Sequence, residues 1–293
     1  MSIQKQLKGT GVAIVTPFAK SGLVDYDALT KLINHLIKGK VEYLVVLGTT
    51  GETATLTKEE KQQVIDHVVK ETKKRVPLVL GIGGNNTQEV IDTIKHTSLS
   101  DFSAILSVSP YYNKPSQRGI YEHYKAIAKS TTKPIILYNV PGRTASNITA
   151  ETTLKLAHNF KNIIAIKEAS GNVEQCMAII NNKPKDFMLI SGDDNLTLPL
   201  LACGAVGVIS VLANAFPESF SNMVRAGLKG DFDTARKLHY QTFEITNQLF
   251  ADGNPGGIKY ALNLLNICKS TVRLPLVEPN DEVKKKLKAL VKG

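Results

Sequence analysis

The most regular feature of the sequence is a series of eight short apolar runs, rich in β-branched residues, with longer mixed stretches between them. The runs cover 12–17, 43–48, 76–82, 104–109, 134–140, 163–169, 187–192 and 206–211. They recur roughly every 19 to 33 residues, about the length of one strand and one helix. Each run is continuously apolar rather than alternating, as strands buried on both faces of a parallel sheet are. The pattern therefore predicts eight buried parallel strands.

The stretches between the runs carry the periodicity and the capping residues of α-helices. Apolar residues with a spacing near 3.6 follow the first run, namely Leu29, Leu32, Ile33, Leu36 and Ile37. Thr57 and Glu60 form a capping-box pattern ahead of a second apolar stripe. Asn86–Thr87 and Thr149 are expected to cap two later helices. A predicted helix thus follows each predicted strand.

Eight such units predict a (β/α)8 TIM barrel, an α/β fold in which helices surround a closed parallel sheet. A doubly wound open sheet is the alternative, but it normally contains fewer strands. The last part of the chain has helical patterns and no further strand-like run. We therefore expect a catalytic barrel at 1–215 and a helical C-terminal extension at 216–293.

Lys167 is the most unusual residue at a predicted strand end, where active sites of these barrels lie. It ends the apolar stretch that begins at Ile163, so alternation predicts that Ile163, Ala165 and Lys167 share the face lining the barrel mouth. Burial of an amine favours its neutral form, a nucleophile that forms a Schiff base with a ketone or aldehyde. The alternative is a lysine that reaches water or pairs with Glu168.

Tyr138 ends the preceding predicted strand at the same level. Neighbouring strands would bring its phenol close to Lys167, and Schiff-base chemistry needs such a proton-transferring group. The alternative is a core tyrosine bonded to the backbone. A third element, the Gly48–Glu52 turn, offers two hydroxyls and free N–H groups suited to a carboxylate or a proton relay. Ser191–Asp194 and Gly81–Asn86 are weaker candidates, typical of simple turns.

Composition and charge narrow the possible functions. The 293 residues include 43% apolar and 21% charged side chains, which is an ordinary globular composition. Lys and Arg outnumber Asp and Glu by 36 to 26, a net charge of +10, but the basic residues are spread over amphipathic stretches. We therefore favour a solvated surface over a nucleic-acid site. A positive field would also attract small carboxylate substrates.

The remaining sequence features bear on cofactors and location. Three cysteines, Cys176, Cys203 and Cys268, cannot all pair, which is typical of a reducing compartment. No metal-ligand spacing, phosphate-binding loop or serine nucleophile elbow is present. No leader peptide is recognisable, and no apolar run approaches the ~20 residues of a membrane span. We expect a soluble, cytoplasmic protein that binds neither metal nor cofactor, membrane nor nucleic acid.

Six motifs at the predicted strand ends support a more specific hypothesis. They are GTTGE (48–52), SPYYNKPSQ (109–117), LYNVPGRT (137–144), IKEASGN (166–172), SGDD (191–194) and GVISV (207–211). Together, in this order, they resemble the dihydrodipicolinate synthase family, one of the class I Schiff-base aldolases that include N-acetylneuraminate lyase. The resemblance spans nearly the whole chain. It implies a lyase that condenses pyruvate with L-aspartate 4-semialdehyde to 4-hydroxy-tetrahydrodipicolinate, in the diaminopimelate route of lysine biosynthesis.

The resemblance also implies roles for individual residues. Lys167 would form the Schiff base, Tyr138 would donate and accept protons, and Thr49 would relay them. Further residues would bind substrate or complete the relay, namely Thr50, Ile209 and Gly192 for pyruvate, Arg143 for aspartate semialdehyde, and Tyr112 from the neighbouring subunit. A relay residue from a neighbour implies an obligate dimer, and the family usually forms a homotetramer, a dimer of dimers.

A possible regulatory lysine site is implied at the dimer interface. Its residues would be Thr53, Ala54, Lys58, Lys61, Asn85, Glu89 and Tyr111. Lys58 and Lys61 stand where lysine-sensitive relatives tend to have histidine, and each ammonium would face the ε-ammonium of the ligand. We therefore expect weak or absent inhibition by lysine.

One segment departs from the family pattern. The family usually carries N-P-[IAV]-P-x-K near the C-terminus, whereas this chain has Asn254-Pro-Gly-Gly-Ile-Lys259. Loss of the second proline predicts a more flexible turn.

The sequence leaves two other functions open. One is a related pyruvate aldolase, such as a sialate or keto-deoxy sugar acid lyase, against which Arg143 and the GTTGE form of the turn argue. The other is a basic barrel that binds nucleic acid without catalysis, which strongly salt-dependent binding would support.

Overall fold

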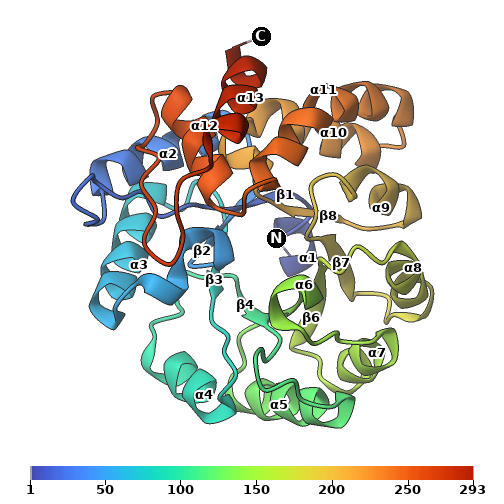
Figure 1. The fold of residues 1–293 in the computed structure, drawn as a ribbon. Helices are drawn as coiled ribbons and strands as arrows, with labels where there is room; N and C mark the ends of the chain where they lie inside the picture. Colours follow the sequence, from blue (N-terminus) through green and yellow to red (C-terminus); the bar gives the residue numbers. More distant parts are fainter. Residues whose placement is uncertain (1, 293) are drawn as a thin grey trace.

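The computed structural model describes residues 2–292 and contains a closed barrel of eight parallel strands in sequence order. Figure 1 shows the helices arranged around it. The predicted (β/α)8 barrel is therefore confirmed. The strands are β1 (Gly9–Ala13), β2 (Tyr43–Val46), β3 (Leu78–Gly81), β4 (Ala104–Val108), β5 (Ile135–Asn139), β6 (Ile163–Glu168), β7 (Met188–Ser191) and β8 (Gly207–Ser210).

A main helix follows each strand, and short helices lie at the two ends of the barrel. The main helices are α2 (Tyr26–Lys38), α3 (Lys58–Thr72), α4 (Thr87–His96), α5 (Gln117–Ser130), α7 (Ala150–Asn159), α8 (Val173–Asn182), α9 (Thr197–Cys203) and α10 (Pro217–Leu228). The short ones are α1 (Ile3–Gln6), α6 (Pro141–Thr144) and the 3-10 turns η1 (Thr49–Gly51), η2 (Thr53–Thr55) and η3 (Leu212–Asn214). The chain ends with α11 (Phe232–Phe250), α12 (Gly256–Leu264) and α13 (Asp281–Lys292).

Strand β1 begins and ends earlier than the apolar pattern predicts. It covers Gly9–Ala13, whereas the apolar run covers 12–17. The reason is the fully buried Tyr43 on the neighbouring strand, because a Cβ on Gly11 would lie 2.2 Å from its ring carbons. A glycine is needed there, and a strand that opens with Gly-Thr-Gly carries no apolar signal.

Strand β6 contains an irregularity that corrects one prediction. The register against β5 shifts, with Ile163 paired to Ile135 and Ala165 paired to the next residue of β5. Ala165 lies in the cluster inside the barrel, whereas Ile163 packs in the outer cluster between strands and helices. The prediction that Ile163 shares a face with Lys167 was wrong, because an extra residue reverses the alternation.

The predicted helix caps are confirmed. Thr57 accepts a hydrogen bond from the backbone N–H of Glu60, whose side chain in turn accepts one from the Thr57 N–H. Asn86 accepts from two N–H groups in the first turn of α4, and Thr149 accepts from the N–H of Thr152 in α7. Each cap of this kind stabilises its helix by about 1 kcal/mol.

The barrel is closed between its first and last strands by pairing and by a buried amide. Strand β8 pairs with β1 over Gly207–Ser210. Asn214 then accepts from the N–H of Val15 at 3.2 Å and donates to the carbonyl of Ala13 at 2.9 Å. Helix α10 packs against β1, β8 and α2. The division at residue 215 stays a prediction, and α10, just beyond it, covers the closing strands.

The C-terminal helices gather on one side of the barrel, and the segment between α12 and α13 runs back beside β2 and α3 (Figure 1). Gly256 and Gly257 are buried in the first turn of α12. A Cβ on Gly257 would lie 2.2 Å from the carbonyl oxygen of Leu249 in α11. Gly257 therefore allows a close contact between α11 and α12, and the more flexible turn stays a prediction.

Candidate active site

Lys167 and Tyr138 lie together at the C-terminal ends of two neighbouring strands. They are paired in the register of β5 and β6, and the Nζ of Lys167 lies 4.0 Å from the centroid of the Tyr138 ring. Lys167 is 5% exposed and Tyr138 is 7% exposed. The structure thus places a buried amine over the ring of a buried phenol at the barrel mouth.

Small residues leave room for the Lys167 side chain. Ala165 lies beneath it in the barrel interior. A Cβ on Gly192, in the loop after β7, would lie 3.1 Å from the Cε of Lys167. Gly192 also donates its N–H to the carbonyl of Glu168 at 2.7 Å. Any larger residue at 192 would press on the amine chain.

Glu168 points away from Lys167, which excludes the ion pair considered from the sequence. Its carboxylate accepts hydrogen bonds from the side chains of Asn139, at 3.0 and 3.1 Å, and Gln175, at 2.8 Å. The N–H of Ser170 donates to it as well, at 2.8 Å. The buried Glu168 carboxylate therefore has its hydrogen-bond partners outside the barrel interior and does not pair with Lys167.

The Gly48–Glu52 turn lies at the end of β2 and contains η1. Thr49 is half-buried, and Thr50 is buried. The side-chain amide of Asn254 donates to the Oγ1 of Thr50 at 3.1 Å. Glu52 closes the turn in the left-handed backbone region, with φ 53°.

Glu52 forms a buried ion pair with a lysine of the C-terminal segment. The Nζ of Lys259 lies 2.5 Å from its Oε1, and both side chains are 0% exposed. The N–H of Arg273 donates to its other oxygen at 3.0 Å. Burial lowers the pKa of Lys259, and the Glu52 carboxylate opposes this shift.

The end of β8 forms a further wall of the site. Ile209 is buried in the interior cluster that also contains Tyr138. Behind it, the buried carboxyl of Asp194 accepts from the N–H groups of Val211 and Leu212, at 3.1 and 3.0 Å. Burial raises the pKa of Asp194 to about 6. This residue of the SGDD motif thus holds the chain just after Ile209.

Two predicted site residues face solvent. Arg143 lies exposed on α6, which directly follows the strand that carries Tyr138. Tyr112, in the loop after β4, is 88% exposed and has a positive φ of 70°. Among residues 2–292, no hydrogen bond joins Thr49, Arg143 or Tyr112 to Lys167.

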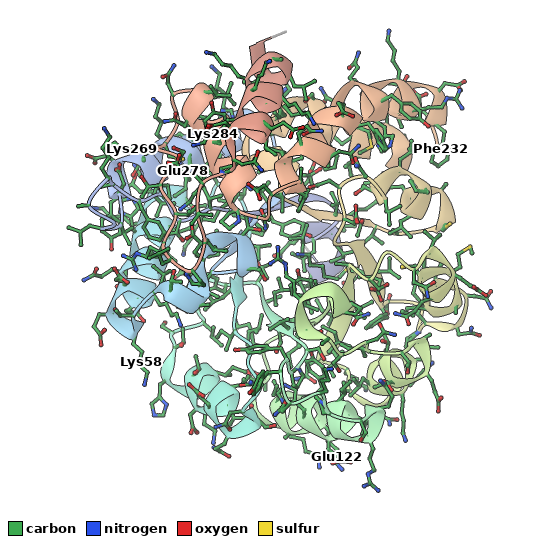
Figure 2. All side chains as sticks on the ribbon, viewed as in Figure 1. Lys58, Glu122, Phe232, Lys269, Glu278 and Lys284 are labelled. Atoms are coloured by element: carbon green, nitrogen blue, oxygen red, sulfur yellow. The ribbon has the colours of Figure 1, made fainter. Side chains whose placement is uncertain are left out.

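The residues of the possible lysine site lie on adjacent loops. Asn85 donates its side-chain amide to the carbonyl of Tyr111 at 3.2 Å, which joins the loops after β3 and β4. Thr53 and Ala54 form η2, and Glu89 is exposed in the first turn of α4. The two lysines belong to the start of α3, and Figure 2 shows Lys58 at its outer edge.

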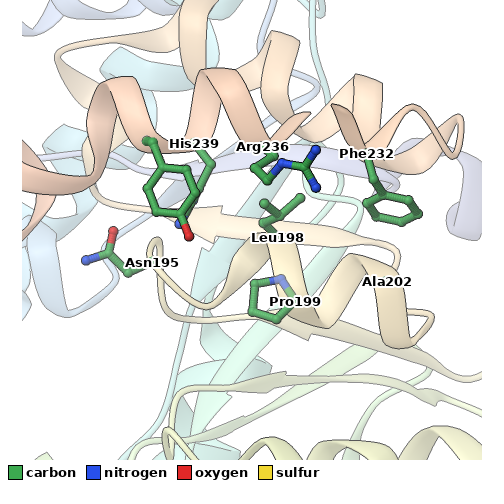
Figure 3. Close-up of a pocket in the computed structure, with 8 residues that line it drawn as sticks. Asn195, Leu198, Pro199, Ala202, Phe232, Arg236 and His239 are labelled. Carbon is green, nitrogen blue, oxygen red and sulfur yellow. The ribbon is translucent and has the colours of Figure 1, made fainter. Parts of the chain in front are cut away.

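The rest of the described chain offers other features, none of them close to Lys167. A cavity of about 470 Å³ lies between α9 and α11, with Pro199, Phe232 and Arg236 among its lining residues (Figure 3). Within residues 2–292, no group of three or more His, Cys, Asp or Glu is placed to hold a metal ion. None of the described helices is both long and apolar enough for a membrane span.

Comparison with known proteins places this geometry in a family. Residues 6–293 match the dihydrodipicolinate synthetase family. The chain belongs to this family. It is 56% identical over 271 residues to the 4-hydroxy-tetrahydrodipicolinate synthase of Parabacteroides distasonis, covering 92% of this chain and 91% of the relative.

Solved structures of synthases of this family share the fold closely. The dihydrodipicolinate synthase of Aquifex aeolicus is 42% identical, with a TM-score of 0.94 over 98% of this chain and 97% of that one. The chloride-inhibited synthase of Acinetobacter baumannii, solved with pyruvate, is 38% identical, with a TM-score of 0.95 over 98% of each chain.

Sequence reasoning singled out Glu52 within its turn, and Asn254 and Lys259 within a departing motif, but it assigned them no shared role. The contacts of Asn254 with Thr50 and of Lys259 with Glu52 each join positions about 200 residues apart in the chain. One feature of the sequence could have indicated this role: Lys259 lies within an otherwise largely apolar stretch of the helical C-terminal region. Such a lysine suggests a buried charge, but the sequence does not show which residue pairs with it.

Proposed function

We propose that Lys167 and Tyr138 carry out the condensation through a lysine Schiff base with pyruvate. The activity is that of a lyase, 4-hydroxy-tetrahydrodipicolinate synthase, which joins pyruvate to L-aspartate 4-semialdehyde in lysine biosynthesis. The observation that carries the assignment of residues is the 4.0 Å approach of the Lys167 amine to the Tyr138 ring, both buried at the barrel mouth.

The reaction begins at the Lys167 nitrogen. Its lone pair adds to the ketone carbon of pyruvate, and loss of water from the carbinolamine gives the imine. Removal of a C3 proton converts the imine to an enamine, whose carbon attacks the aldehyde of the second substrate and forms the new C–C bond. The amino group of that substrate then displaces Lys167 and closes the ring, which releases the free amine.

The surrounding groups would move protons and bind carboxylates. Tyr138, whose ring lies beside the amine, would donate and accept protons, and Thr49 would relay protons to it. Thr50 would bind the pyruvate carboxylate with its hydroxyl. Arg143, exposed at the rim, suits the carboxylate of aspartate semialdehyde, because a guanidinium fork binds a carboxylate with two hydrogen bonds.

Ile209 and Gly192 would complete the pyruvate pocket. Ile209 forms the wall at the end of β8, where its backbone would contact the substrate. Gly192 leaves the space that the Lys167 chain and its adduct require.

The site would be completed in a homodimer, and two dimers would form a tetramer. Tyr112 projects from the barrel on a strained loop, which suits a residue that reaches a neighbouring site. A second exposed apolar surface lies on α11, at Phe232, Tyr240, Phe243 and Phe250. Exposed apolar patches of this kind mark protein–protein contacts.

The similarities argue against the two other functions. The relatives reported above are synthases of this family rather than sialate or sugar-acid lyases. The buried amine and phenol have a use in catalysis and none in binding nucleic acid. A cytoplasmic location stays a prediction.

Borohydride trapping tests the Schiff base. Reduction in the presence of pyruvate should add one adduct per chain, and peptide mapping should place it on Lys167. The Lys167→Arg variant should lose trapping, because a guanidinium stays protonated and is not a nucleophile. Lys133→Arg is the matched control, since Lys133 precedes β5 at the opposite end of the barrel and should trap normally. An adduct on another lysine of the folded protein would contradict the assignment.

A further inference from the structure

The Gly48–Glu52 turn is fixed from outside by the C-terminal segment of the chain. Glu52 ends the turn, and its fully buried carboxylate meets the Lys259 ammonium at 2.5 Å and the Arg273 N–H at 3.0 Å. Arg273 also spans the Glu60 carboxylate with two nitrogens, at 2.6 and 2.7 Å. Residues from α12 and the segment after it thus hold both the turn and the start of α3.

The Lys259 ammonium has three partners within the protein. It donates to the carbonyl of Thr271 at 2.9 Å and lies 4.0 Å from the centroid of the buried Phe18 ring, besides its pairing with Glu52. A buried ion pair of this kind seldom adds stability over apolar residues of the same volume, because desolvation offsets the attraction. Its direct effect is geometric, since it fixes the position of Glu52, two residues after Thr50.

Asn254 acts on the same turn by a different contact. Its side-chain amide donates to the Oγ1 of Thr50 at 3.1 Å, and both residues are buried. A hydroxyl oxygen that accepts from Asn254 keeps its own proton for another acceptor. A carboxylate is an acceptor only, so this contact leaves Thr50 as the donor that such a ligand requires.

We propose that Asn254 and the Glu52–Lys259 ion pair are positioning residues for pyruvate, which fix the turn and direct the Thr50 hydroxyl towards the substrate carboxylate. The proposal rests on the proposed role of Thr50 in binding that carboxylate. It gives the C-terminal segment a part in substrate binding, although none of its residues touches the reacting atoms.

Two substitutions of Asn254 test the hydrogen bond. Asn254→Ala removes the donor, so the pyruvate KM should rise about ten-fold while kcat changes little. Asn254→Asp should raise it further, by about a hundred-fold at neutral pH, because a carboxylate would accept the Thr50 proton and repel the substrate anion. A purely structural role would instead raise the KM for aspartate semialdehyde in parallel with that for pyruvate and lower Tm in the same order.

The ion pair is tested with Lys259→Met, Glu52→Gln and the double variant. Lys259→Met leaves a buried carboxylate unpaired and should raise the pyruvate KM about ten- to a hundred-fold, with the KM for aspartate semialdehyde changed less. The double variant should recover thermal stability but not the pyruvate KM. Arg225→Met is the matched control, because it breaks the Arg225–Glu42 pair, 2.8 Å long, at the opposite end of the barrel. It should lower Tm and leave the pyruvate KM unchanged.

Trapping measured against pyruvate concentration separates this proposal from the proposed function. If the unaltered enzyme forms no adduct on Lys167, the proposed Schiff-base role of Lys167 is wrong. If it does, but the folded Asn254 variants reach half-maximal trapping at the same pyruvate concentration as the parent, the positioning role is overturned. Asn254→Ala keeps the test usable should the charge variants fail to fold, since it removes only one neutral hydrogen bond.

Discussion

The side chains of two adjacent residues of β6, Lys167 and Glu168, point in opposite directions, and this keeps the Lys167 amine apart from the Glu168 carboxylate. Lys167 points into the barrel over Tyr138, whereas Glu168 points outwards and accepts from Asn139 and Gln175. Had the two side chains formed an ion pair, the amine would be held protonated and its lone pair would be blocked. The strand geometry therefore suits the nucleophilic role proposed for Lys167.

Loss of the proton-transferring groups should slow turnover. We expect Tyr138→Phe and Thr49→Val each to reduce kcat by roughly 10²- to 10⁴-fold, the usual contribution of such groups. Steady-state kinetics with both substrates measures the effect. Near-normal kcat in both variants would remove these residues from the relay.

Arg143 should matter for the second substrate only. Because it lies exposed on α6, we expect Arg143→Ala to lower kcat/KM for aspartate semialdehyde while borohydride still traps pyruvate on Lys167. The two readouts are independent, so the assignment fails if trapping falls in parallel with turnover.

A buried histidine should make the fold sensitive to acid. Burial lowers the pKa of His123 to about 4, and its Nδ1 lies 2.8 Å from the Thr87 hydroxyl. The unfolded chain binds a proton near pH 6.5 and the folded chain does not, so stability present above pH 6.5 is lost as the pH falls towards 4. The loss is about 3 kcal/mol over that interval.

His123→Asn should remove this dependence. The fall in Tm between pH 7 and pH 4.5 should be smaller in the variant than in the parent, as measured by thermal unfolding. The same change at His96, exposed at the end of α4, serves as the control. An equal fall in Tm for parent and His123 variant would show that this histidine does not drive the acid response.

Among the elements, local signals were sufficient for most helices and strands. Capping residues such as Thr57 and Asn86 act within one helical turn, so their effect can be predicted from the residues next to them in the sequence. Strand β1 and the irregularity in β6 could not be predicted, because both depend on the strand alongside. In the first case the partner is the Tyr43 ring, and in the second it is the register of β5.

The start of α3 should weaken any feedback by lysine. Lys58 and Lys61 lie in its first turn, beside Thr53 and Ala54. Each ammonium would face that of a bound lysine, and like charges about 4 Å apart cost roughly 1–4 kcal/mol at effective dielectric constants of 80 to 20. We therefore predict weak or absent inhibition.

Titration of L-lysine in a steady-state assay tests this prediction. The double variant Lys58→Gln/Lys61→Gln should be inhibited at lower lysine concentration than the parent. Half-inhibition of the parent at submillimolar lysine would show that the two side chains do not oppose the ligand.

In the molecule as a whole, the barrel and the proximity of Lys167 to Tyr138 could be predicted, whereas the long-range contacts around them could not. That proximity follows because the fifth and sixth strands are neighbours in any (β/α)8 barrel. Contacts such as Asn254 to Thr50 cross 204 positions, and only the folded chain reveals them. The same holds for the close contact of Gly257 with α11. From the sequence, the missing proline indicated only a more flexible turn and gave no sign of this contact.

Assembly should depend on the aromatic face of α11. Replacing Tyr240 and Phe243 by Glu should convert a tetramer into dimers, because two charges would have to be buried at the contact. Sedimentation velocity measures the change, and circular dichroism checks that the variant is folded. Leu274→Glu is the control, because Leu274 is more exposed than Tyr240 and Phe243 but lies outside α11. A tetramer in the double variant would exclude this face.

The contact between Arg273 and Glu52 also sets an order of events during synthesis. The two residues are 221 positions apart, so at about 5–20 residues per second the ribosome needs roughly 11 to 44 seconds to make the second after the first. Strands β3 to β8 and Lys167 are translated within that interval, after β1 and β2. A nascent chain can therefore close its barrel while the turn that would receive pyruvate still lacks its outer support. If the C-terminal segment positions that turn as proposed, competence for substrate would be acquired only as the last part of the chain is made.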